Sequence, residues 1–303
     1  MFKSGFVSII GRPNVGKSTF LNSCLGQKIS IISPKAQTTR NAIKGIYTDE
    51  EAQIVFIDTP GIHKPKNELG EFMNKQALSS LNDSDLVLWI VDSTEEYGSG
   101  DMYIKHILED VKVPLIIAFN KIDKSIIAKN INVKSINALF NENKNKFLDN
   151  LNYSSSIDIS SLNGTNVDKL IDVIKQNLDE GPMYYPKDAI TDEPVRFIAS
   201  EIIREKIFLL TKEEIPHSVA VIIDDMRADE EGLMNIFATI YVERKSQKKI
   251  IIGEAGSMIK KIGTLARKEI NLLIGEKTYL ELWVKVEEGW RTKRRTLSML
   301  GYK

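Results

Sequence analysis

The octapeptide GRPNVGKS at residues 11–18 has the spacing G-x-x-x-x-G-K-[ST], which is typical of a phosphate-binding loop. The apolar stretch FVSII precedes it, and the helical pattern STFLNSCL overlaps its end. At such a junction backbone N–H groups surround phosphate oxygens, and the start of the helix favours negative charge. We therefore expect Lys17 to contact the β- and γ-phosphates of a nucleotide and the Ser18 hydroxyl to bind Mg²⁺.

A second motif, IVFIDTPG, ends an apolar stretch with Asp58. A carboxylate in this position can hold Mg²⁺, directly or through water, opposite Ser18. Gly61 would let a backbone N–H approach the γ-phosphate closely. Alone, Asp58 is equally well explained as a cap, but beside a phosphate-binding loop it indicates a magnesium–nucleotide site.

A third motif, PLIIAFNKID, places Asn120, Lys121 and Asp123 just past another apolar stretch. The Asp123 carboxylate can accept hydrogen bonds from both N1–H and N2–H₂ of guanine. Adenine lacks both donors in that geometry and would leave the acid unpaired, at a cost of roughly a few kcal/mol. Asn120 can hold the loop together, and the stem of Lys121 can cover the purine face. The three motifs together favour GTP over ATP.

The elements that must position these motifs alternate along the first part of the chain. Short, β-branched runs predict strands buried on both faces, with amphipathic helical patterns between them. This alternation predicts an α/β domain with a doubly wound sheet and right-handed crossovers, spanning residues 1–179. Its last helix is expected to start at Thr165 with a capping box and to end near Asp179. The predicted strands are Gly5–Ile10, Gln53–Ile57, Asp85–Val91, Pro114–Phe119 and Ser156–Ile159.

The stretch EGPMYYPKDAITDEP, with its glycine, prolines and acidic residues, predicts a linker over residues 180–194. A smaller α+β domain is expected over residues 195–303. It begins with a helix at Val195–Leu210, followed by strands at Ser218–Asp224 and Ile236–Glu243 that are separated by a polar turn. We expect Gly232 and Asn235 near that turn.

The stretch KIIIGEAGSMIKK at residues 249–261 follows and is interpreted as a glycine turn between a strand and a basic helix. That helix continues through Ile270, a strand follows at Tyr279–Val286, and a basic tail, WRTKRRTLSMLGYK, comes last. The asparagine- and lysine-rich segment at residues 129–152 is interpreted as a surface helix of the first domain, because Val133, Ile136, Leu139 and Phe140 keep helical spacing.

Composition excludes several classes of protein. The 303-residue chain is 42% apolar, which indicates a globular protein, and no apolar run is long enough for a membrane span. Cys24 is the single cysteine, so an internal disulfide is impossible and a cysteine-based metal site is disfavoured. Net charge is zero, yet residues 240–303 carry 15 Lys and Arg against 7 Asp and Glu. This basic end suggests an anionic partner, although solvated helix faces explain it equally well.

The order of elements in the second domain resembles a type II KH domain. The tetrapeptide Gly253-Glu254-Ala255-Gly256 would be its GxxG loop, which clamps the backbone of about four single-stranded nucleotides. The glycines allow close approach of the backbone, and the following helix supplies positive potential. Lysines flank the loop at Lys248, Lys249, Lys260 and Lys261.

Five short motifs, GRPNVGKS, TTR at 38–40, DTPG, NKID and ISS at 159–161, resemble the G motifs of translation-factor-class GTPases of the TrmE-Era-EngA type. The resemblance implies that Thr39, rather than Thr38, completes the Mg²⁺ shell and that Ser160 and Ser161 contact guanine O6. Asn14 matches an asparagine that helps to bind K⁺ in related GTPases, although it is equally well explained as a loop residue.

With the KH-like domain added, almost the whole chain resembles the Era family of bacterial ribosome-assembly GTPases. The matching stretches include KAQTTR, DTPGIHKPKNELGEFMNKQAL and YLELWVKVEEGWR. The resemblance implies GTP hydrolysis to GDP and phosphate, and binding to the 3′ end of 16S rRNA and to the 30S subunit. It also implies a role in small-subunit maturation and a cytoplasmic location with some peripheral membrane contact.

The expected catalytic residues are Lys17, Thr39 and Gly61, and the expected metal ligands are Ser18, Thr39 and Asp58 for Mg²⁺ and Asn14 for K⁺. The expected RNA-binding residues are Lys248, Lys249, Gly253, Glu254, Ala255, Gly256, Lys260 and Lys261. The expected nucleotide-binding residues are Gly11, Arg12, Pro13, Asn14, Val15, Gly16, Lys17, Ser18, Thr19, Asp58, Thr59, Pro60, Gly61, Ile62, Asn120, Lys121, Ile122, Asp123, Ser160 and Ser161.

Two positions depart from the expected patterns. Ile62 stands where Ras-like proteins carry a water-orienting glutamine, so slow intrinsic turnover is expected. The KH-like loop carries Glu254 and Ala255, where Era-type loops usually have a lysine before the second glycine. His63 follows closely and could be proposed as a base, but we interpret its Pro- and Lys-rich surroundings as a moving switch segment.

Two other functions fit parts of the sequence. One is a signalling GTPase whose basic tail binds anionic lipid, and preference for a single-stranded RNA over vesicles would separate it from an RNA-binding switch. The other is a non-enzymatic RNA-binding assembly factor with a vestigial nucleotide site. The intact Lys17, Ser18, Asp58 and Asp123 argue against the second.

Overall fold

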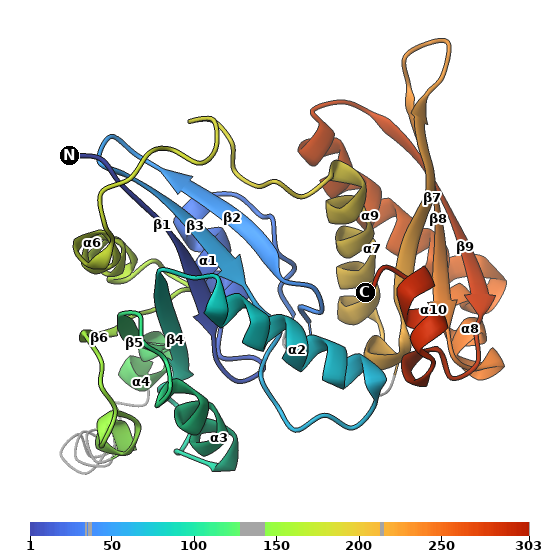
Figure 1. Cartoon of the computed structure of the whole chain (residues 1–303). Helices are drawn as coiled ribbons and strands as arrows, with labels where there is room; N and C mark the ends of the chain where they lie inside the picture. The colour runs from blue at the N-terminus through green and yellow to red at the C-terminus, as the bar shows by residue number, and fades with distance from the viewer. Residues whose placement is uncertain (34, 36–37, 128–142, 213–214, 303) are drawn as a thin grey trace. The chain divides into compact units, whose positions relative to one another are not determined.

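The computed structural model describes residues 1–33, 35, 38–127, 143–212 and 215–302 (Figure 1). The chain divides into two compact units, and neither is one continuous piece of sequence. Unit 1 comprises Met1–Ser30, Thr39–Lys64 and Met73–Asp192, and unit 2 comprises Ile31–Thr38, Pro65–Phe72 and Glu193–Lys303. Two short segments from the first half of the chain therefore belong to unit 2.

Unit 1 is built on a six-stranded sheet with the order β2-β3-β1-β4-β5-β6. All neighbouring strands are parallel except β2 and β3, which are antiparallel. Strands β3, β4 and β5 are buried along their whole length, as their continuous apolar sequences predict. The strands are β1 (Lys3–Ile10), β2 (Ile43–Thr48), β3 (Ala52–Asp58), β4 (Leu86–Asp92), β5 (Leu115–Asn120) and β6 (Ser155–Asp158).

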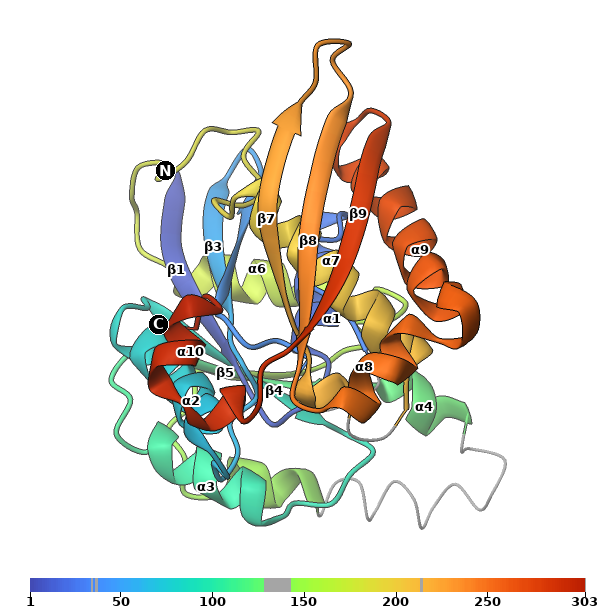
Figure 2. The same ribbon diagram turned by 90° about the vertical axis from the view of Figure 1, so that its right-hand side faces the viewer.

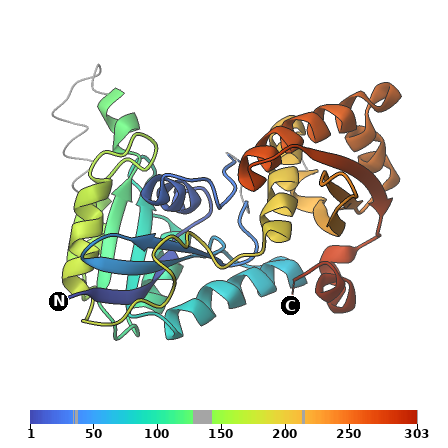
Figure 3. The same cartoon turned by 90° about the horizontal axis from the view of Figure 1, so that it is seen from above.

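Helices cover both faces of this sheet, which confirms the predicted doubly wound α/β fold. Seen from above (Figure 3), α1 and α2 lie on opposite sides of the strands. Side chains of α2 and α3, including Ala77, Ile104 and Leu108, pack in one core cluster with Trp89 of β4 and Ile117 of β5. The helices are α1 (Lys17–Leu25), α2 (Glu68–Asn82), α3 (Ser99–Leu108), α4 (Ile122–Ile127) and α6 (Val167–Asn177).

Two details of unit 1 differ from the sequence predictions. Strand β2, with the sequence IKGIYT, was not predicted, because Lys, Gly and Thr interrupt its apolar pattern; it pairs with one neighbour at the edge of the sheet. The predicted capping box at Thr165 is wrong. Helix α6 starts at Val167 after Asn166, which caps it without a side-chain hydrogen bond. The Thr165 hydroxyl instead donates to Asn163 Oδ1 at 2.7 Å. The residues predicted to give helical spacing near Val133 lie outside the described residues.

The residues after α6 lie against unit 1. Gln53 Oε1 accepts hydrogen bonds from the backbone N–H groups of Tyr184 and Tyr185, and Gln53 Nε2 donates to the Tyr185 carbonyl at 2.9 Å. The Ile46 N–H donates to the Ile190 carbonyl at 2.7 Å. Residues up to Asp192 therefore cluster with unit 1, while the linker boundaries at 180–194 stay a prediction.

Unit 2 contains a three-stranded sheet with the order β7-β8-β9, in which β7 and β8 are antiparallel and β8 and β9 are parallel. Figure 2 shows the three strands side by side, with α7 and α9 on one face of the sheet. The core between them includes Ile203 of α7, Ile240 of β8 and Ile262 of α9, all without exposed surface. The strands are β7 (Ala220–Ala228), β8 (Met234–Val242) and β9 (Thr278–Val286), and the helices are α7 (Val195–Leu210), α8 (Lys245–Ile252), α9 (Ser257–Ile274) and α10 (Arg294–Met299).

The isoleucine run before the GEAG tetrapeptide is helical, so the strand expected there is wrong. Gln247 Oε1 accepts from the Arg244 N–H at 3.0 Å and fixes the start of α8. Gln247 and Ile251, four residues apart, are both buried, while Ile250 between them is 50% exposed, and this i, i+4 spacing is helical burial. Here capping and amphipathic burial override the β propensity of isoleucine. The tetrapeptide thus joins two helices.

Two further details concern the rest of unit 2. Asn235 lies near the β7–β8 turn, as expected: it is the second residue of β8, and its Nδ2 donates to Asp229 Oδ2 at 3.0 Å. The basic tail is folded: Trp290 is fully buried, stacks on Tyr302 at a centroid distance of 5.9 Å and precedes α10. The cluster of basic residues at 293–295 is followed by few apolar residues, so the sequence carries little helical periodicity here.

Candidate functional site

The loop between β1 and α1 has the backbone of a tight phosphate-binding turn. Gly11 has a φ of 152°, and a Cβ there would lie 2.3 Å from the Ile90 carbonyl oxygen. Gly16 has a φ of 103°, and a Cβ there would lie 2.3 Å from Asn120 Nδ2. Only glycine fits at both positions. Helix α1 starts immediately after, so Ser18 and Thr19 lie in its first turn.

Lys17 lies over this loop. Its Nζ donates to the carbonyl oxygens of Gly11 at 3.1 Å and Arg12 at 3.0 Å. Burial lowers the pKa of Lys17 to about 8, and the negative charge of Asp58 opposes this shift. A triphosphate in the loop would bring further negative charge to the ammonium group, which favours the charged lysine.

Ser18, Thr39 and Asp58 come together although they are far apart in sequence. Ser18 Oγ donates to Asp58 Oδ2 at 2.6 Å and lies 2.9 Å from Thr39 Oγ1. Asp58 has no exposed surface, and burial raises its pKa while Lys17 opposes the shift. Among the described residues, Asp58 Oδ1 is buried without a hydrogen-bond partner. Two hydroxyls and a carboxylate with a spare oxygen fit Mg²⁺, which prefers oxygen ligands.

Sequence reasoning missed one member of this cluster. Ser30 is fully buried, and its Oγ donates to Asp58 Oδ2 at 2.8 Å. Asn22 fixes Ser30 by accepting from its N–H at 3.0 Å and donating to its carbonyl at 2.6 Å. No motif signals a lone serine in a loop, so the sequence carried no indication of this contact.

The DTPG segment packs directly on the phosphate-binding loop. A Cβ on Gly61 would lie 2.6 Å from the Pro13 nitrogen, and the Ile62 N–H donates to the Gly11 carbonyl at 3.1 Å. Before it, the Thr59 hydroxyl donates to the Ile9 carbonyl at 2.7 Å, and Pro60 follows. These contacts hold the Gly61 backbone beside the expected γ-phosphate position.

Ile62 and His63 have surroundings that disfavour a role as a base. Ile62 is 1% exposed and packs in the core cluster of α2, α3, β4 and β5, so its side chain has neither a polar group nor access to water. The His63 ring Nδ1 lies 2.8 Å from the Gly61 carbonyl oxygen. Asn74 of α2 accepts from the His63 N–H and donates to its carbonyl at 2.6 Å, which fixes the backbone here.

Residues after β5 and β6 form the end of the site where a base would bind. Asn120 Nδ2 donates to the Val15 carbonyl at 2.8 Å, and Asn120 Oδ1 accepts from the Ser161 N–H at 2.9 Å. Ser160 Oγ donates to Asp123 Oδ1 at 2.5 Å, and the Ile122 N–H donates to the Ile159 carbonyl. The structure therefore brings the NKID and ISS motifs together against the phosphate-binding loop.

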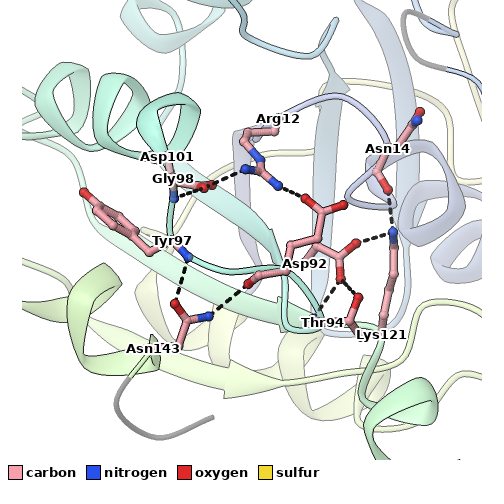
Figure 4. A network of polar contacts seen from close by, with 10 residues as sticks. Arg12, Asn14, Asp92, Thr94, Tyr97, Gly98, Asp101, Lys121 and Asn143 are labelled. Atoms are coloured by element: carbon pink, nitrogen blue, oxygen red, sulfur yellow. Dashed lines mark hydrogen bonds and ion pairs between the residues drawn. The ribbon is translucent and has the colours of Figure 1, made fainter. Parts of the chain in front are cut away.

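Lys121 also connects the NKID motif to the phosphate-binding loop, and it reaches the end of β4. Its Nζ donates to the Asn14 carbonyl at 2.7 Å and to Asp92 Oδ2 at 2.5 Å (Figure 4). Burial would raise the pKa of Asp92, but hydrogen bonds from Lys121 and Thr94 lower it overall. Asp92 was not predicted, although it ends β4 as Asp58 ends β3, and this parallel could have revealed it.

In unit 2, the GEAG tetrapeptide forms a short turn between α8 and α9. Gly253 and Gly256 have φ values of 74° and 78°, and Ala255, at 48°, also lies in the left-handed region that favours glycine. A Cβ on Gly253 would lie 2.7 Å from the Met258 backbone nitrogen. Glu254 and Ala255 are exposed, and so are three of the four flanking lysines: Lys249, Lys260 and Lys261. Lys248 is half-buried.

Comparison with protein families and solved structures decides the assignment. Residues 6–121 match the family described as "50S ribosome-binding GTPase", and residues 214–291 match the KH domain family. The chain is 41% identical to a point variant of Era from Aquifex aeolicus bound to GDP·AlF₄⁻, with a TM-score of 0.91 over 99% of each chain. It is also 41% identical to Era in complex with MgGDPNP and nucleotides 1506–1542 of 16S ribosomal RNA, with a TM-score of 0.92 over 100% of this chain and 99% of that one.

The chain belongs to the Era family of GTPases. This confirms the family and the two-domain fold that the sequence predicts, a G domain followed by a KH domain. The segment of this Era-family chain that matches the GTPase family contains the first three G motifs and the Asn120-Lys121 half of NKID, and the segment that matches the KH family contains the GEAG loop. Among the described residues, no helix is long and apolar enough to cross a membrane.

Proposed function

We propose that this protein is a GTP-hydrolysing switch that binds the 3′ end of 16S rRNA and the 30S subunit through its KH domain and assists small-subunit maturation. The related Era structure that contains both MgGDPNP and 16S rRNA nucleotides supports this function, because it matches this chain over its full length. The observation that carries the GTPase part is the Ser18–Thr39–Asp58 cluster beside Lys17.

Each part of the nucleotide has a proposed set of partners. Ser18, Thr39 and Asp58 hold Mg²⁺, and the unpartnered Asp58 Oδ1 supports that role. Backbone groups of the 11–18 loop and Lys17 bind the phosphates. Asp123 accepts the guanine N–H groups, while its bond from Ser160 fixes the direction of the carboxylate. Mg²⁺ supplies charge neutralisation at the phosphates when it is bound.

Turnover is proposed to use Lys17, Thr39 and the Gly61 backbone, because Ile62 is buried and apolar. A K⁺ ion held with the help of Asn14 would add positive charge to the same region. Asn14 has a φ of 65°, which turns the loop sharply, and Lys121 fixes its carbonyl. The alternative is a loop residue tolerant of the left-handed region, and comparing turnover in K⁺ and Na⁺ separates it from the K⁺ role.

The RNA contact is proposed to rest on Gly253, Gly256, the start of α9 and the flanking lysines. The half-buried glycines lie between two helices, and their lack of a side chain allows a nucleic-acid backbone to approach closely. Lys249, Lys260 and Lys261 are exposed beside it and supply the charge that Glu254 and Ala255 lack.

Coupling between nucleotide and RNA is supported by the composition of unit 2, which contains Ile31–Thr38 and Pro65–Phe72. These segments precede Thr39 and follow the DTPG motif. Arg204 Nη2 of α7 donates to the Thr38 carbonyl at 2.5 Å, and Glu205 Oε1 accepts from the Ile32 N–H at 3.0 Å. The segment that precedes Thr39, which we expect to respond to a γ-phosphate, is thus hydrogen-bonded to the first helix of the KH domain.

The Arg204 guanidinium also contacts other side chains of α7. It pairs with Glu201 one turn earlier and lies 5.1 Å from the Phe208 ring centroid. Lys35 Nζ donates to the carbonyls of Phe208 and Thr211 at the end of α7. The segment 31–38 therefore has bonds to both the middle and the end of this helix.

The alternative of a lipid-binding tail has less support. Trp290 is buried, Arg291 pairs with Glu243, and Arg294 pairs with Glu68 at 2.8 Å, so part of the tail's charge is already used within unit 2. A cytoplasmic location with peripheral contact at the inner face of the membrane stays a prediction from the family resemblance.

The function is tested by measuring GTP turnover and binding of a 16S rRNA 3′-end fragment in the GDP and GDPNP states. Gly253→Asp places a charge and a Cβ in the loop, and Gly232→Asp serves as control. Gly232 also has a positive φ, 83°, but lies in the turn between β7 and β8. Loss of RNA binding in the first variant alone is expected. Wild-type protein without turnover, with and without RNA, would contradict the function.

A further inference from the structure

Arg12, the second residue of the phosphate-binding loop, directs its guanidinium to α3. Figure 4 shows the side chain reaching the first turn of that helix. Its Nη1 donates to Asp101 Oδ2 at 2.9 Å, and its Nη2 pairs with Glu95. An arginine beside a triphosphate site could supply positive charge to the γ-phosphate. Here, however, the guanidinium is paired with two carboxylates.

The pair with Asp101 is built into the protein rather than lying on its surface. The Asp101 side chain is 3% exposed, and that of Arg12 is 21% exposed. Burial raises the pKa of Asp101, whereas the Gly98 N–H, 3.1 Å away, and the Arg12 charge lower it. Removing one partner of such a pair leaves a buried charge without compensation, which is costly.

Gly100 makes room for the Arg12 side chain at the start of α3. A Cβ on Gly100 would lie 2.9 Å from Arg12 Cδ, whereas one on Gly98 would lie 3.6 Å from Arg12 Nη1, an ordinary van der Waals distance. Gly100 is the second residue of α3, a position where glycine weakens a helix relative to alanine. The close approach of the Arg12 side chain explains why a glycine stands at position 100.

The segment that receives Arg12 is itself held in place. Asn143 Oδ1 accepts from the Tyr97 N–H at 2.8 Å, and Asn143 Nδ2 donates to the Glu95 carbonyl at 2.9 Å (Figure 4). The Asp92 carboxylate accepts from the Thr94 N–H and hydroxyl. Glu95 and Asp101 are therefore presented by a loop with fixed backbone on both sides.

The phosphate-binding loop is thus attached to residues 92–101 at two points. The first is the Arg12 guanidinium, and the second runs from the Asn14 carbonyl through Lys121 to Asp92. On its inner side, the Arg12 carbonyl also accepts from Lys17 Nζ. A shift of Arg12 would therefore move an acceptor of the lysine that is expected to bind the phosphates.

We propose that Arg12 is a positioning residue: it clamps the phosphate-binding loop to the start of α3 and thereby sets how long a guanine nucleotide stays bound. It contributes no charge to the reacting phosphate. This inference rests on the proposed nucleotide site, and it adds residues 92–101 as the support of that site.

The test uses the full-length protein and a fluorescent GDP analogue. Arg12→Ala and Asp101→Asn are each expected to speed dissociation of the analogue ~10-fold or more, because each removes the charged hydrogen bond between the phosphate-binding loop and α3. The double variant should dissociate no faster than the faster single variant, since both remove one interaction. Arg12→Lys should fall between wild type and Arg12→Ala. The control is Lys187→Ala, which removes an exposed ion pair with Glu50 in the same unit.

Turnover at saturating GTP and Mg²⁺ separates positioning from transition-state charge. The clamp predicts that in every variant the dissociation rate of the analogue changes by a larger factor than kcat does, because a bound triphosphate helps to hold Lys17 and the loop in place. Unchanged dissociation with a large loss of kcat in Arg12→Ala would overturn the proposal. Wild-type protein that binds no guanine nucleotide would instead contradict the proposed function.

A further variant guards against misfolding of Arg12→Ala. Gly100→Ala keeps every charge and favours the helix, but crowds Arg12 at Cδ. Faster dissociation of the analogue from a chain that is at least as heat-stable as wild type is expected. Dissociation as slow as wild type in both Gly100→Ala and Arg12→Lys would contradict the clamp.

Discussion

Ser18 Oγ donates a 2.6 Å hydrogen bond to Asp58 Oδ2 across 40 positions of sequence. The bond joins the start of α1 to the end of β3, and the second oxygen of Asp58 is buried without a partner among the described residues. Asp58 is therefore expected to be sensitive to loss of its charge, because two serines donate to it and we propose it as a Mg²⁺ ligand.

We predict that Asp58→Asn lowers Mg²⁺-dependent GTP affinity by at least ~10-fold, because the amide offers one weaker oxygen ligand in place of a carboxylate. Binding of a fluorescent GTP analogue over a Mg²⁺ titration measures the effect. Ser30→Ala removes a hydrogen bond to the same oxygen while keeping its charge, and a smaller loss is expected there. Equal losses in both variants would contradict a metal role for Asp58.

Base choice is predicted to depend on Asp123. Asp123→Asn is expected to lower GTP affinity by on the order of 100-fold, because an amide cannot accept from both guanine N–H groups. The same variant should gain affinity for xanthosine triphosphate, whose C2 carbonyl can accept from the new amide. Competition binding with the two nucleotides checks this. Ser160→Ala removes the hydrogen bond to Asp123 Oδ1. It should lower the affinity for GTP without changing the preference for guanine over xanthine.

The G domain was largely predictable from sequence because its chemistry lies in contiguous motifs at strand ends. GRPNVGKS, DTPG and NKID each join an element to a loop, so their local patterns already give their positions in the sheet. Strand β2 was missed because an edge strand needs fewer apolar residues than a buried one. Ser30 was missed because its contact with Asp58 depends on the fold alone.

In the KH domain, the isoleucine run before Gly253 gave the wrong element. Three adjacent β-branched residues favour a strand, but the buried residues of this segment, Gln247 and Ile251, are four apart, so burial follows a helix. The assignment of segments 31–38 and 65–72 to unit 2 could not be predicted either. It depends on side chains of α7 and α10, such as Arg204 and Arg294, that reach distant backbone and carboxylate groups.

K⁺ is predicted to raise the rate of GTP turnover more than Na⁺ does. Ile62 offers no group to orient water, so an additional cation near Asn14 would compensate at the phosphates. Turnover measured at matched ionic strength in the two salts checks this. Asn14→Ala should abolish the difference between salts, although its loss of a residue suited to positive φ also strains the loop. Asn14→Gly keeps that conformation accessible, and a preserved salt difference in it would argue against an Asn14 ligand.

The folded C-terminal tail is predicted to contribute to stability. Trp290 is fully buried, and its Nε1 donates to the Ser218 carbonyl at 3.0 Å. Trp290→Ala is expected to destabilise the KH domain by ~3–5 kcal/mol through loss of buried contacts. Urea unfolding followed by circular dichroism measures this, and Trp290→Phe should cost less because it keeps most of the apolar volume. A destabilisation below about 1 kcal/mol for alanine would mean that the tail is dispensable for folding.

Coupling between nucleotide and RNA is predicted to depend on Lys35. Its ammonium group donates to the carbonyls of Phe208 and Thr211, where α7 ends and backbone acceptors lack helical partners. Lys35→Ala is expected to reduce the difference in RNA affinity between the GDPNP and GDP states several-fold, since coupling free energies are typically about 1–3 kcal/mol.

The same measurement separates coupling from a simple loss of charge. Lys35→Ala should leave GTP affinity close to wild type, because Lys35 touches none of the proposed nucleotide ligands in the described contacts. Lys75→Ala, which removes an exposed lysine of α2, is the control for net charge. Equal reductions of RNA affinity in both nucleotide states would assign Lys35 to RNA attraction rather than to coupling. If the ratio between the two states falls while the control keeps it, the segment 31–38 transmits the nucleotide state through α7.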